Sequence, residues 1–356
     1  MQRKEDRGGQ PLIDCDIHNA VTLLDTLYPY LPDHWVDYGK NSKFFGPDAS
    51  DYPAGSPIKT RPDFKVEGAG PPGSTLDQVQ DQVLDTWETE YGILTCIYQA
   101  SCVHNEDLGA ALATAVNAWQ MEKWLEPEPR LRGSIVVASQ NPKLAAQEIE
   151  RCGDNPAFVQ VILPVRSLVP YGNHRYDPIF EAAVRHDLAI GIHYGGAPGH
   201  PSTPSGWATS FIEEYAGMSG VFQAQVVSLV AEGAFNRFPE LRVALIEGGF
   251  TWLPSLMWRL DKDWKGLRSD TPWVKERPSE YMRRHIRLTV QPWNVSSDQA
   301  QIQQIIGQLD SDEMLMFSTD YPHWHFDTPE EAFPADLPES LRHKIYSENA
   351  REFYRL

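Results

Sequence analysis

The chain has 356 residues, which is enough for one large domain or two modest ones. Its hydrophobic content of 41% and charged content of 22% are typical of a soluble globular protein. The net charge of −18 argues against a nucleic-acid partner or an anionic membrane surface, and no apolar run approaches the roughly 20 residues that span a bilayer.

The N-terminal segment, residues 1–11, is charged and lacks the apolar stretch of a signal peptide, so we expect a short flexible tail. Residues 12–356 are expected to form a single domain. The cysteines (Cys15, Cys96, Cys102 and Cys152) show no CxxC spacing, and three of them lie in or beside predicted core strands. This pattern favours buried thiols in a reducing cytoplasm, and we predict a cytoplasmic protein.

Short apolar runs rich in β-forming residues recur along the chain, and longer helical patterns separate them. The runs cover residues 12–18, 91–98, 131–137, 158–164, 189–195, 242–248, 286–292 and 314–322. They are nearly continuous in apolar residues, which is typical of parallel strands covered on both faces. The helical patterns cover residues 107–125, 142–152, 177–187, 219–238 and 298–309.

Eight strands alternating with helices in a chain of this length favour a (β/α)8 TIM barrel over an open doubly wound sheet. A Rossmann fold would carry a GxGxxG loop after the first strand, and the sequence has none there. Two stretches rich in Pro, Gly and aromatic residues interrupt the repeat, at about 33–75 and 195–218. Because they follow the first and fifth strands, we predict that they are walls or lids at the C-terminal face, where barrel enzymes build their sites.

Polar side chains repeatedly end these apolar runs, where burial would be costly unless a partner satisfied them. The residues concerned are Asp16, His18, His193, Glu247 and Asp320. A single histidine at a strand end is more often a hydrogen-bonded core residue than a ligand. Five such residues on four strands of one barrel, however, converge on one opening. Their imidazole and carboxylate groups predict a site for Zn²⁺, Mn²⁺ or Fe²⁺.

The order of these residues resembles the amidohydrolase superfamily, and the branch that contains aminocarboxymuconate semialdehyde decarboxylase in particular. The similarity rests on the DxH of the first strand and on the stretches GIHYGG, LIEGGFTWLPSLMWRLD and FSTDYPH. It extends from about Leu12 to the C-terminus. The resemblance implies a (β/α)8 barrel with a divalent metal at its mouth, often in a dimer. It also implies that His193 is a ligand and that Asp320 is a ligand or general base.

The sequence departs from that family at two ligand positions. The usual HxH of the first strand is absent, since Asn19 and Ala20 follow His18, and Glu247 stands where the family usually has histidine. The site is therefore richer in carboxylate, which shifts the expected preference from Zn²⁺ toward Fe or Mn. In this respect it is similar to a subgroup of oxygenases with a dinuclear metal centre, including an α-aminoisobutyrate hydroxylase. That resemblance implies one or two ions held by Asp16, His18, His193, Glu247, Asp320 and His323.

Other residues are candidates for acid–base chemistry or for the pocket. His323, three residues after Asp320, is expected either to reach a second metal or to act with Asp320 in catalysis. Weaker candidates line the predicted pocket or its lids: His104, His200, Trp207 and His325.

Three functions remain open from the sequence. The first is hydroxylation of a small, amino-acid-like substrate with O2 at an Fe or Mn centre, which the carboxylate-rich ligand set favours. The second is hydrolysis or decarboxylation with a metal-activated water, the commoner chemistry of the superfamily. The third is a structural partner subunit of a catalytic paralogue. We expect a homo-oligomer or a hetero-oligomer with such a paralogue.

Overall fold

The computed structural model describes residues 9–47, 53, 59–196, 201–323 and 337–356. The described residues form one eight-stranded parallel sheet in which each strand pairs with the next along the chain. The strands are β1 (Ile13–Ile17), β2 (Tyr91–Leu94), β3 (Leu131–Val136), β4 (Phe158–Arg166), β5 (Ala189–Gly196), β6 (Val243–Ile246), β7 (Ile286–Thr289) and β8 (Leu315–Met316). Each of the eight apolar runs of the sequence therefore overlaps a strand.

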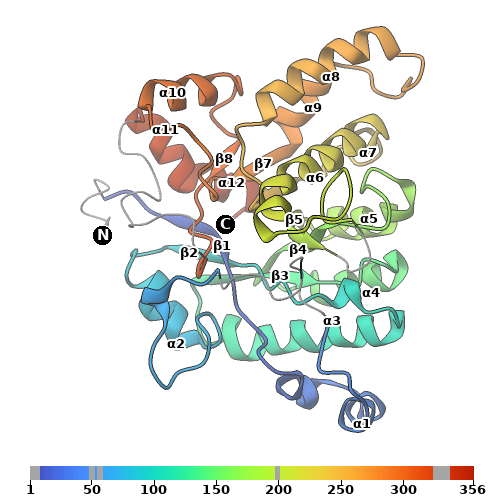
Figure 1. Ribbon diagram of the computed structural model, residues 1–356, viewed down its shortest axis with the longest axis vertical. Helices are drawn as coiled ribbons and strands as arrows, with labels where there is room; N and C mark the ends of the chain where they lie inside the picture. Colours follow the sequence, from blue (N-terminus) through green and yellow to red (C-terminus); the bar gives the residue numbers. More distant parts are fainter. Residues whose placement is uncertain (1–8, 48–52, 54–58, 197–200, 324–336) are drawn as a thin grey trace.

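The sheet curves until its last strand meets its first. The backbone N–H of Cys15 in β1 donates to the carbonyl of Phe317, 3.0 Å away, and Ile17 forms a parallel bridge with Tyr321. The helices lie around the strands (Figure 1). This arrangement is the predicted (β/α)8 barrel, nearly closed, and its strand interiors are buried on both faces.

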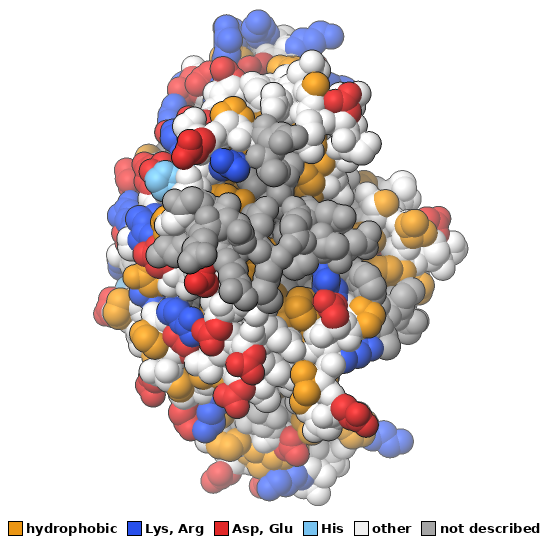
Figure 2. Space-filling model, turned by 90° about the vertical axis from the view of Figure 1, so that its left-hand side faces the viewer, with side chains coloured by type: hydrophobic (Ala, Val, Ile, Leu, Met, Phe, Trp, Pro, Cys, Tyr) orange, Lys and Arg blue, Asp and Glu red, His pale blue; other side chains and the backbone are white. Residues whose placement is uncertain are grey.

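The helices of the described residues cover the outside of the barrel or connect its strands. They are α1 (Asp33–Asn41), α2 (Leu76–Val79), α3 (Glu106–Gln120), α4 (Pro142–Cys152), α5 (Asp177–Arg185), α6 (Phe211–Ala231), α7 (Ala234–Arg237), α8 (Leu253–Leu267), α9 (Pro278–His285), α10 (Gln299–Gly307), α11 (Glu339–His343) and α12 (Asn349–Tyr354). None of these helices is long and apolar enough to cross a membrane. Acidic and basic side chains are interspersed over the face drawn in Figure 2.

One predicted helix, 219–238, has different bounds in the structure. It begins earlier, at Phe211, because Ser210 and Glu213 form a reciprocal capping box at its N-terminus. It ends at Ala231, and Gly233 then takes a left-handed conformation with φ of +73° before α7 begins. The second predicted insertion, 195–218, therefore contains the first two turns of α6.

An ion pair before β3, at the end of the barrel away from the strands' carboxyl termini, yields a prediction on acid stability. Arg130 lies 2.7 Å from Glu128, and its hydrogen bonds lower the pKa of Glu128 from 4.5 to about 2. The stabilisation is therefore present above pH 4.5 and is lost as the pH falls toward 2. Glu128→Gln removes the charge that pairs with Arg130 and should lower the free energy of unfolding at pH 7. The loss should be only about 1 kcal/mol because solvent screens such pairs, and it should be much smaller at pH 2.5. Urea unfolding at both pH values would measure this, and equal losses at the two would contradict it.

Candidate metal centre

The first strand places three polar side chains on one face. Asp14, Asp16 and His18 are spaced by two residues, so they point to the same side of β1 and its continuation, toward the barrel interior. Asp14 and Asp16 are fully buried, and His18 is 5% exposed. Burying this many ionisable groups in an apolar barrel costs free energy unless the groups have charged or hydrogen-bonding partners.

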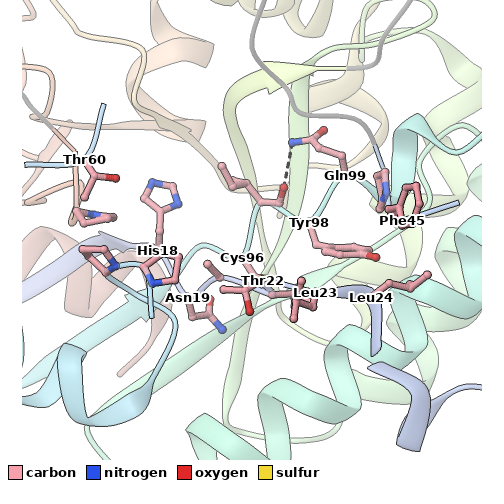
Figure 3. Close-up of a pocket in the computed structure, with 18 of the residues that line it drawn as sticks. His18, Asn19, Thr22, Leu23, Leu24, Phe45, Thr60, Cys96, Tyr98 and Gln99 are labelled. Carbon is pink, nitrogen blue, oxygen red and sulfur yellow. Dashed lines mark hydrogen bonds between the residues drawn. The ribbon is translucent and has the colours of Figure 1, made fainter. Parts of the chain in front are cut away.

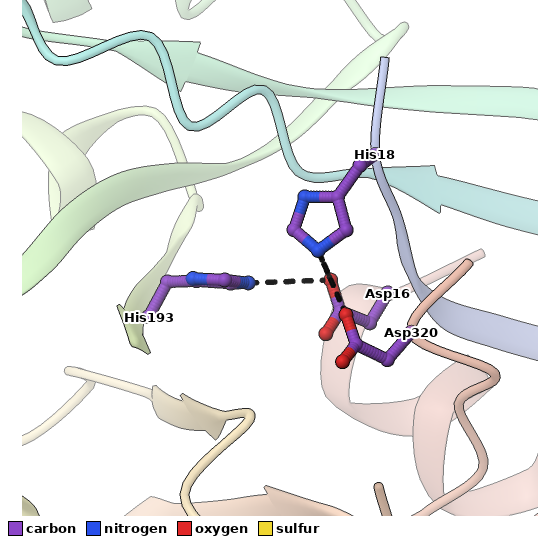
Figure 4. Close-up of side chains that lie close together, drawn as sticks. All are labelled: Asp16, His18, His193 and Asp320. Atoms are coloured by element: carbon purple, nitrogen blue, oxygen red, sulfur yellow. Dashed lines mark hydrogen bonds and ion pairs between the residues drawn. The ribbon is translucent and has the colours of Figure 1, made fainter. Parts of the chain in front are cut away.

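Asp16 and His18 meet residues from two distant strands at the C-terminal end of the barrel (Figure 4). His18 Nε2 lies 2.8 Å from Asp320 Oδ1, and His193 Nε2 lies 3.5 Å from Asp16 Oδ1. The rings of His18 and His193 are nearly perpendicular, with centroids 5.0 Å apart. Two carboxylates and two imidazoles thus face one another around one small volume.

Asp320 and Glu247 both have left-handed backbone conformations, with φ of +56° and +59°. Such values are uncommon for residues other than glycine and cluster at functional sites. Each residue follows its strand, β8 or β6, and the turn carries its carboxylate to the barrel mouth. Glu247 Oε2 lies 3.7 Å from His193 Nε2, and Tyr215 donates a hydrogen bond to Glu247 Oε1 at 3.1 Å.

The two buried histidines have raised pKa values although burial by itself lowers them. For His193, burial is the largest effect, but the charges of Asp16 and Glu247 outweigh it and raise the pKa to about 9. For His18, Asp16 and the hydrogen bond to Asp320 likewise outweigh burial and raise the pKa. The carboxylates therefore favour a positive charge at this position, which a proton or a metal cation can supply.

The side chains present fit a divalent cation. Two groups of four residues each bring one ligand atom per residue within 4.8 Å of the others. The first group is Asp16, His18, His193 and Asp320, and the second is His18, Glu247, Asp320 and His323. In the first, Asp16 Oδ2 is buried and makes no hydrogen bond within the described part of the chain. Mixed imidazole and carboxylate donors suit Mn, Fe or Zn.

A pocket of about 450 Å³ opens beside this cluster (Figure 3). His18 and His323 line it, together with Tyr98 and Gln99 after β2. Further lining residues come from the first predicted insertion: Phe45, Gly46, Pro47, Thr60, Pro71 and Pro72. The ligand cluster therefore has room for a small organic molecule next to it.

The remaining predicted residues fall in different places. His323 is near the cluster, since its Nδ1 lies 3.0 Å from Asp320 Oδ1. His104 is exposed just before the N-cap of α3 and is not among the residues that line the pocket. Trp207 is half exposed, at 50%. His200 and His325 lie outside the described residues.

Three residues of the site went unnoticed in the sequence. Thr95, just after β2, forms hydrogen bonds with both Asp16 and His18. It could have been noticed in the sequence as a polar residue within the apolar run 91–98. Asp14 precedes Asp16 by two residues, and burial raises its pKa to about 7 despite hydrogen bonds from Thr319. Tyr215 lies in the second predicted insertion, and nothing in the sequence indicated that it would donate a hydrogen bond to Glu247.

Comparison with known proteins agrees with this architecture. The model of the amidohydrolase family (Amidohydro_2) matches residues 13–356. The chain is 25% identical to a gamma-resorcylate decarboxylase of Polaromonas sp. strain JS666 over 307 residues, which cover 80% of this chain and 89% of that protein. It is 24% identical to the gamma-resorcylate decarboxylase of Rhodococcus jostii over 318 residues, with 80% and 92% covered.

Solved structures with the same fold include two decarboxylases. The 5-carboxyvanillate decarboxylase of Sphingomonas paucimobilis superposes with a TM-score of 0.67 at 20% identity, covering 98% of this chain and 99% of that one. A dihydroxybenzoic acid decarboxylase of Polaromonas sp. JS666, with bound manganese and the inhibitor 2-nitroresorcinol, gives 0.65 at 21% identity, covering 98% and 97%. At these identities the structural likeness concerns the fold.

Proposed function

This chain belongs to the amidohydrolase family, and from that premise we propose that it is a metal-dependent decarboxylase of a small aromatic carboxylic acid. The ligand set in the sequence had put oxidation first and hydrolysis or decarboxylation second. The relatives support the second hypothesis better than the first, because the two gamma-resorcylate decarboxylases are matched over about nine-tenths of their length. A bound manganese ion in one structural neighbour supports Mn²⁺ among the metals expected.

The observation that carries this proposal is the position of the ligand cluster beside the pocket. Asp16, His18, His193 and Asp320 would hold the cation, and His18 also lines the pocket. When bound, a divalent cation supplies positive charge that orients a substrate oxygen and withdraws electron density from the reacting carbon. The pocket wall is part polar and part apolar, and its apolar part includes Tyr98, Phe45 and Leu23, which suits an aromatic body.

His323 and Asp320 are placed to manage the proton that decarboxylation requires. His323 lines the pocket, and its Nδ1 lies 3.0 Å from Asp320 Oδ1. In decarboxylation the C–C bond breaks, CO2 leaves, and the electron pair remains on the carbon, which must gain a proton. We assign to this pair the delivery of that proton, with His323 as the group nearer the substrate and Asp320 as its partner.

A cation near the same mouth supports an anionic substrate. Lys59 Nζ lies 4.8 Å from the ring centre of Tyr194 and 5.3 Å from that of Phe211. Tyr194 follows the candidate ligand His193, and Thr60, next to Lys59, bridges to His323. The positive charge of Lys59 therefore adds to the attraction of a carboxylate toward this end of the barrel.

The proposal is tested by substrate turnover with and without oxygen. Mn²⁺-loaded protein is incubated anaerobically with a panel of hydroxylated benzoic acids, and CO2 and the remaining acid are quantified. We expect one CO2 per acid consumed, at the same rate in air, since no step requires an oxidant. Consumption of O2 with a hydroxylated product, and no CO2 under anaerobic conditions, would contradict decarboxylation.

Oxidation at a dinuclear centre is the second candidate, because one specific feature favours it. The two ligand groups share His18 and Asp320, so a second ion near Glu247 and His323 would lie beside the first. Two Fe or Mn ions per chain, together with the O2-dependent outcome above, would support this function. One ion per chain, with turnover independent of O2, would support decarboxylation.

A further inference from the structure

Thr95 touches two of the candidate metal ligands at once. It follows β2 directly, is fully buried, and is anchored by its backbone N–H, which donates to the carbonyl of Ile17 at 2.8 Å. Its hydroxyl donates to Asp16 Oδ1 at 2.5 Å, and its carbonyl lies 3.0 Å from His18 Nδ1. We infer that Thr95 is a positioning residue that sets the orientation of both Asp16 and His18 for cation binding. This inference rests on the metal centre proposed above.

The contact with His18 determines which ring nitrogen is available. A backbone carbonyl can only accept a hydrogen bond, so Nδ1 of His18 must carry the hydrogen that faces Thr95. In the neutral imidazole Nε2 then presents its lone pair, and Nε2 is the atom that points to Asp320 and Asp16. Outer partners of this kind fix the tautomer and ring orientation of a metal-binding histidine.

The contact with Asp16 determines how its carboxylate is turned. The Thr95 hydroxyl occupies Oδ1, the oxygen that also lies 3.5 Å from His193 Nε2. The other oxygen, Oδ2, is buried and makes no hydrogen bond to any residue within the described ranges. Thr95 therefore holds one oxygen of Asp16 in place and leaves the other oxygen for a cation.

The inference is tested on metal affinity, because a structural role alone would not change it. Metal-free Thr95→Val and Thr95→Ser proteins are titrated with Mn²⁺, and free Mn²⁺ is followed by its electron paramagnetic resonance signal. We expect Thr95→Val to weaken binding by about 10- to 100-fold, the usual effect of losing an outer partner. Every variant keeps the backbone carbonyl that faces His18, so Thr95→Val removes only the hydroxyl contact to Asp16. Thr95→Ser keeps that hydroxyl, so its affinity should stay close to that of the wild type. Saturating Mn²⁺ should restore most of the activity of Thr95→Val.

A matched control separates this effect from the loss of any hydroxyl–carboxylate bond. Thr114 on α3 donates to Glu148 at 2.7 Å, away from the site, and Thr114→Val should leave Mn²⁺ affinity unchanged. If the valine variant does not fold, the Mn²⁺ affinity of Thr95→Ala is measured instead. Wild-type affinity in folded Thr95→Val or Thr95→Ala would overturn the inference, as would a serine variant as weak as the valine one. Failure of the wild type to bind Mn²⁺ would instead overturn the metal centre itself, and the role of Thr95 with it.

Discussion

Asp320→Asn should lower kcat/KM by about 10³-fold or more, because the proposed function gives this one carboxylate two roles, as a cation ligand and as a partner in proton transfer. Asp320 is fully buried, and its Oδ1 lies 2.8 Å from His18 Nε2 and 3.0 Å from His323 Nδ1. Asparagine keeps the shape but removes the negative charge, so it weakens the attraction for a cation and cannot exchange a proton with His323. Steady-state kinetics at saturating Mn²⁺ would measure the loss.

The backbone does not account for this expected loss. Asp320 has a φ of +56°, and asparagine tolerates the left-handed region about as well as aspartate does. Asp310 is a matched control, since it has a φ of +55° but is exposed, with Arg283 as an ion-pair partner 3.4 Å away. Asp310→Asn should leave kcat/KM unchanged. Activity in Asp320→Asn within about tenfold of the wild type would contradict both roles of Asp320.

Removal of the metal should abolish turnover and lower the thermal stability of the protein. The carboxylates of Asp16, Glu247 and Asp320 lie in a buried cluster, so without a cation they repel one another or retain protons on His18 and His193. A cation that binds only the folded state stabilises it by about 4 kcal/mol at a free concentration near 1,000 times its Kd. Chelator-treated protein, assayed for activity and for Tm with and without added Mn²⁺, would measure both effects.

Two histidine variants define the site of this stabilisation. His193→Gln removes an imidazole whose Nε2 lies near Asp16 and Glu247, so added Mn²⁺ should raise its Tm much less than that of the wild type. His104→Gln changes an exposed histidine outside the cluster and should respond like the wild type. Full activity of the chelated wild type, or an equal response of His193→Gln, would contradict the proposed centre.

The strand pattern could be read from the sequence because of where the strands lie. Strands covered on both faces need nearly continuous apolar residues, and each of the eight such runs overlaps a strand of the barrel. Helix ends were harder, since the start of α6 depends on the capping pair Ser210 and Glu213 within a stretch that reads as a loop. The bounds of this predicted helix therefore differ in the structure, while the barrel itself was confirmed.

The candidate ligands could be recognised for the same reason. Polar residues at the ends of apolar runs need a partner when they are buried, and such positions can be recognised from the sequence alone. They are Asp16, His18, His193, Glu247 and Asp320. The partner that each of these residues contacts cannot be recognised in this way. His18 and Asp320 are 302 positions apart, and they touch only because the chain after β8 pairs with β1. Thr95 acquires its two contacts only when β2 lies beside β1. The sequence by itself thus determined the barrel and the types of side chain at the candidate site, because burial acts on each strand separately. Tertiary structure alone decided the pairing and orientation of those ligands, because these depend on how the sheet curves.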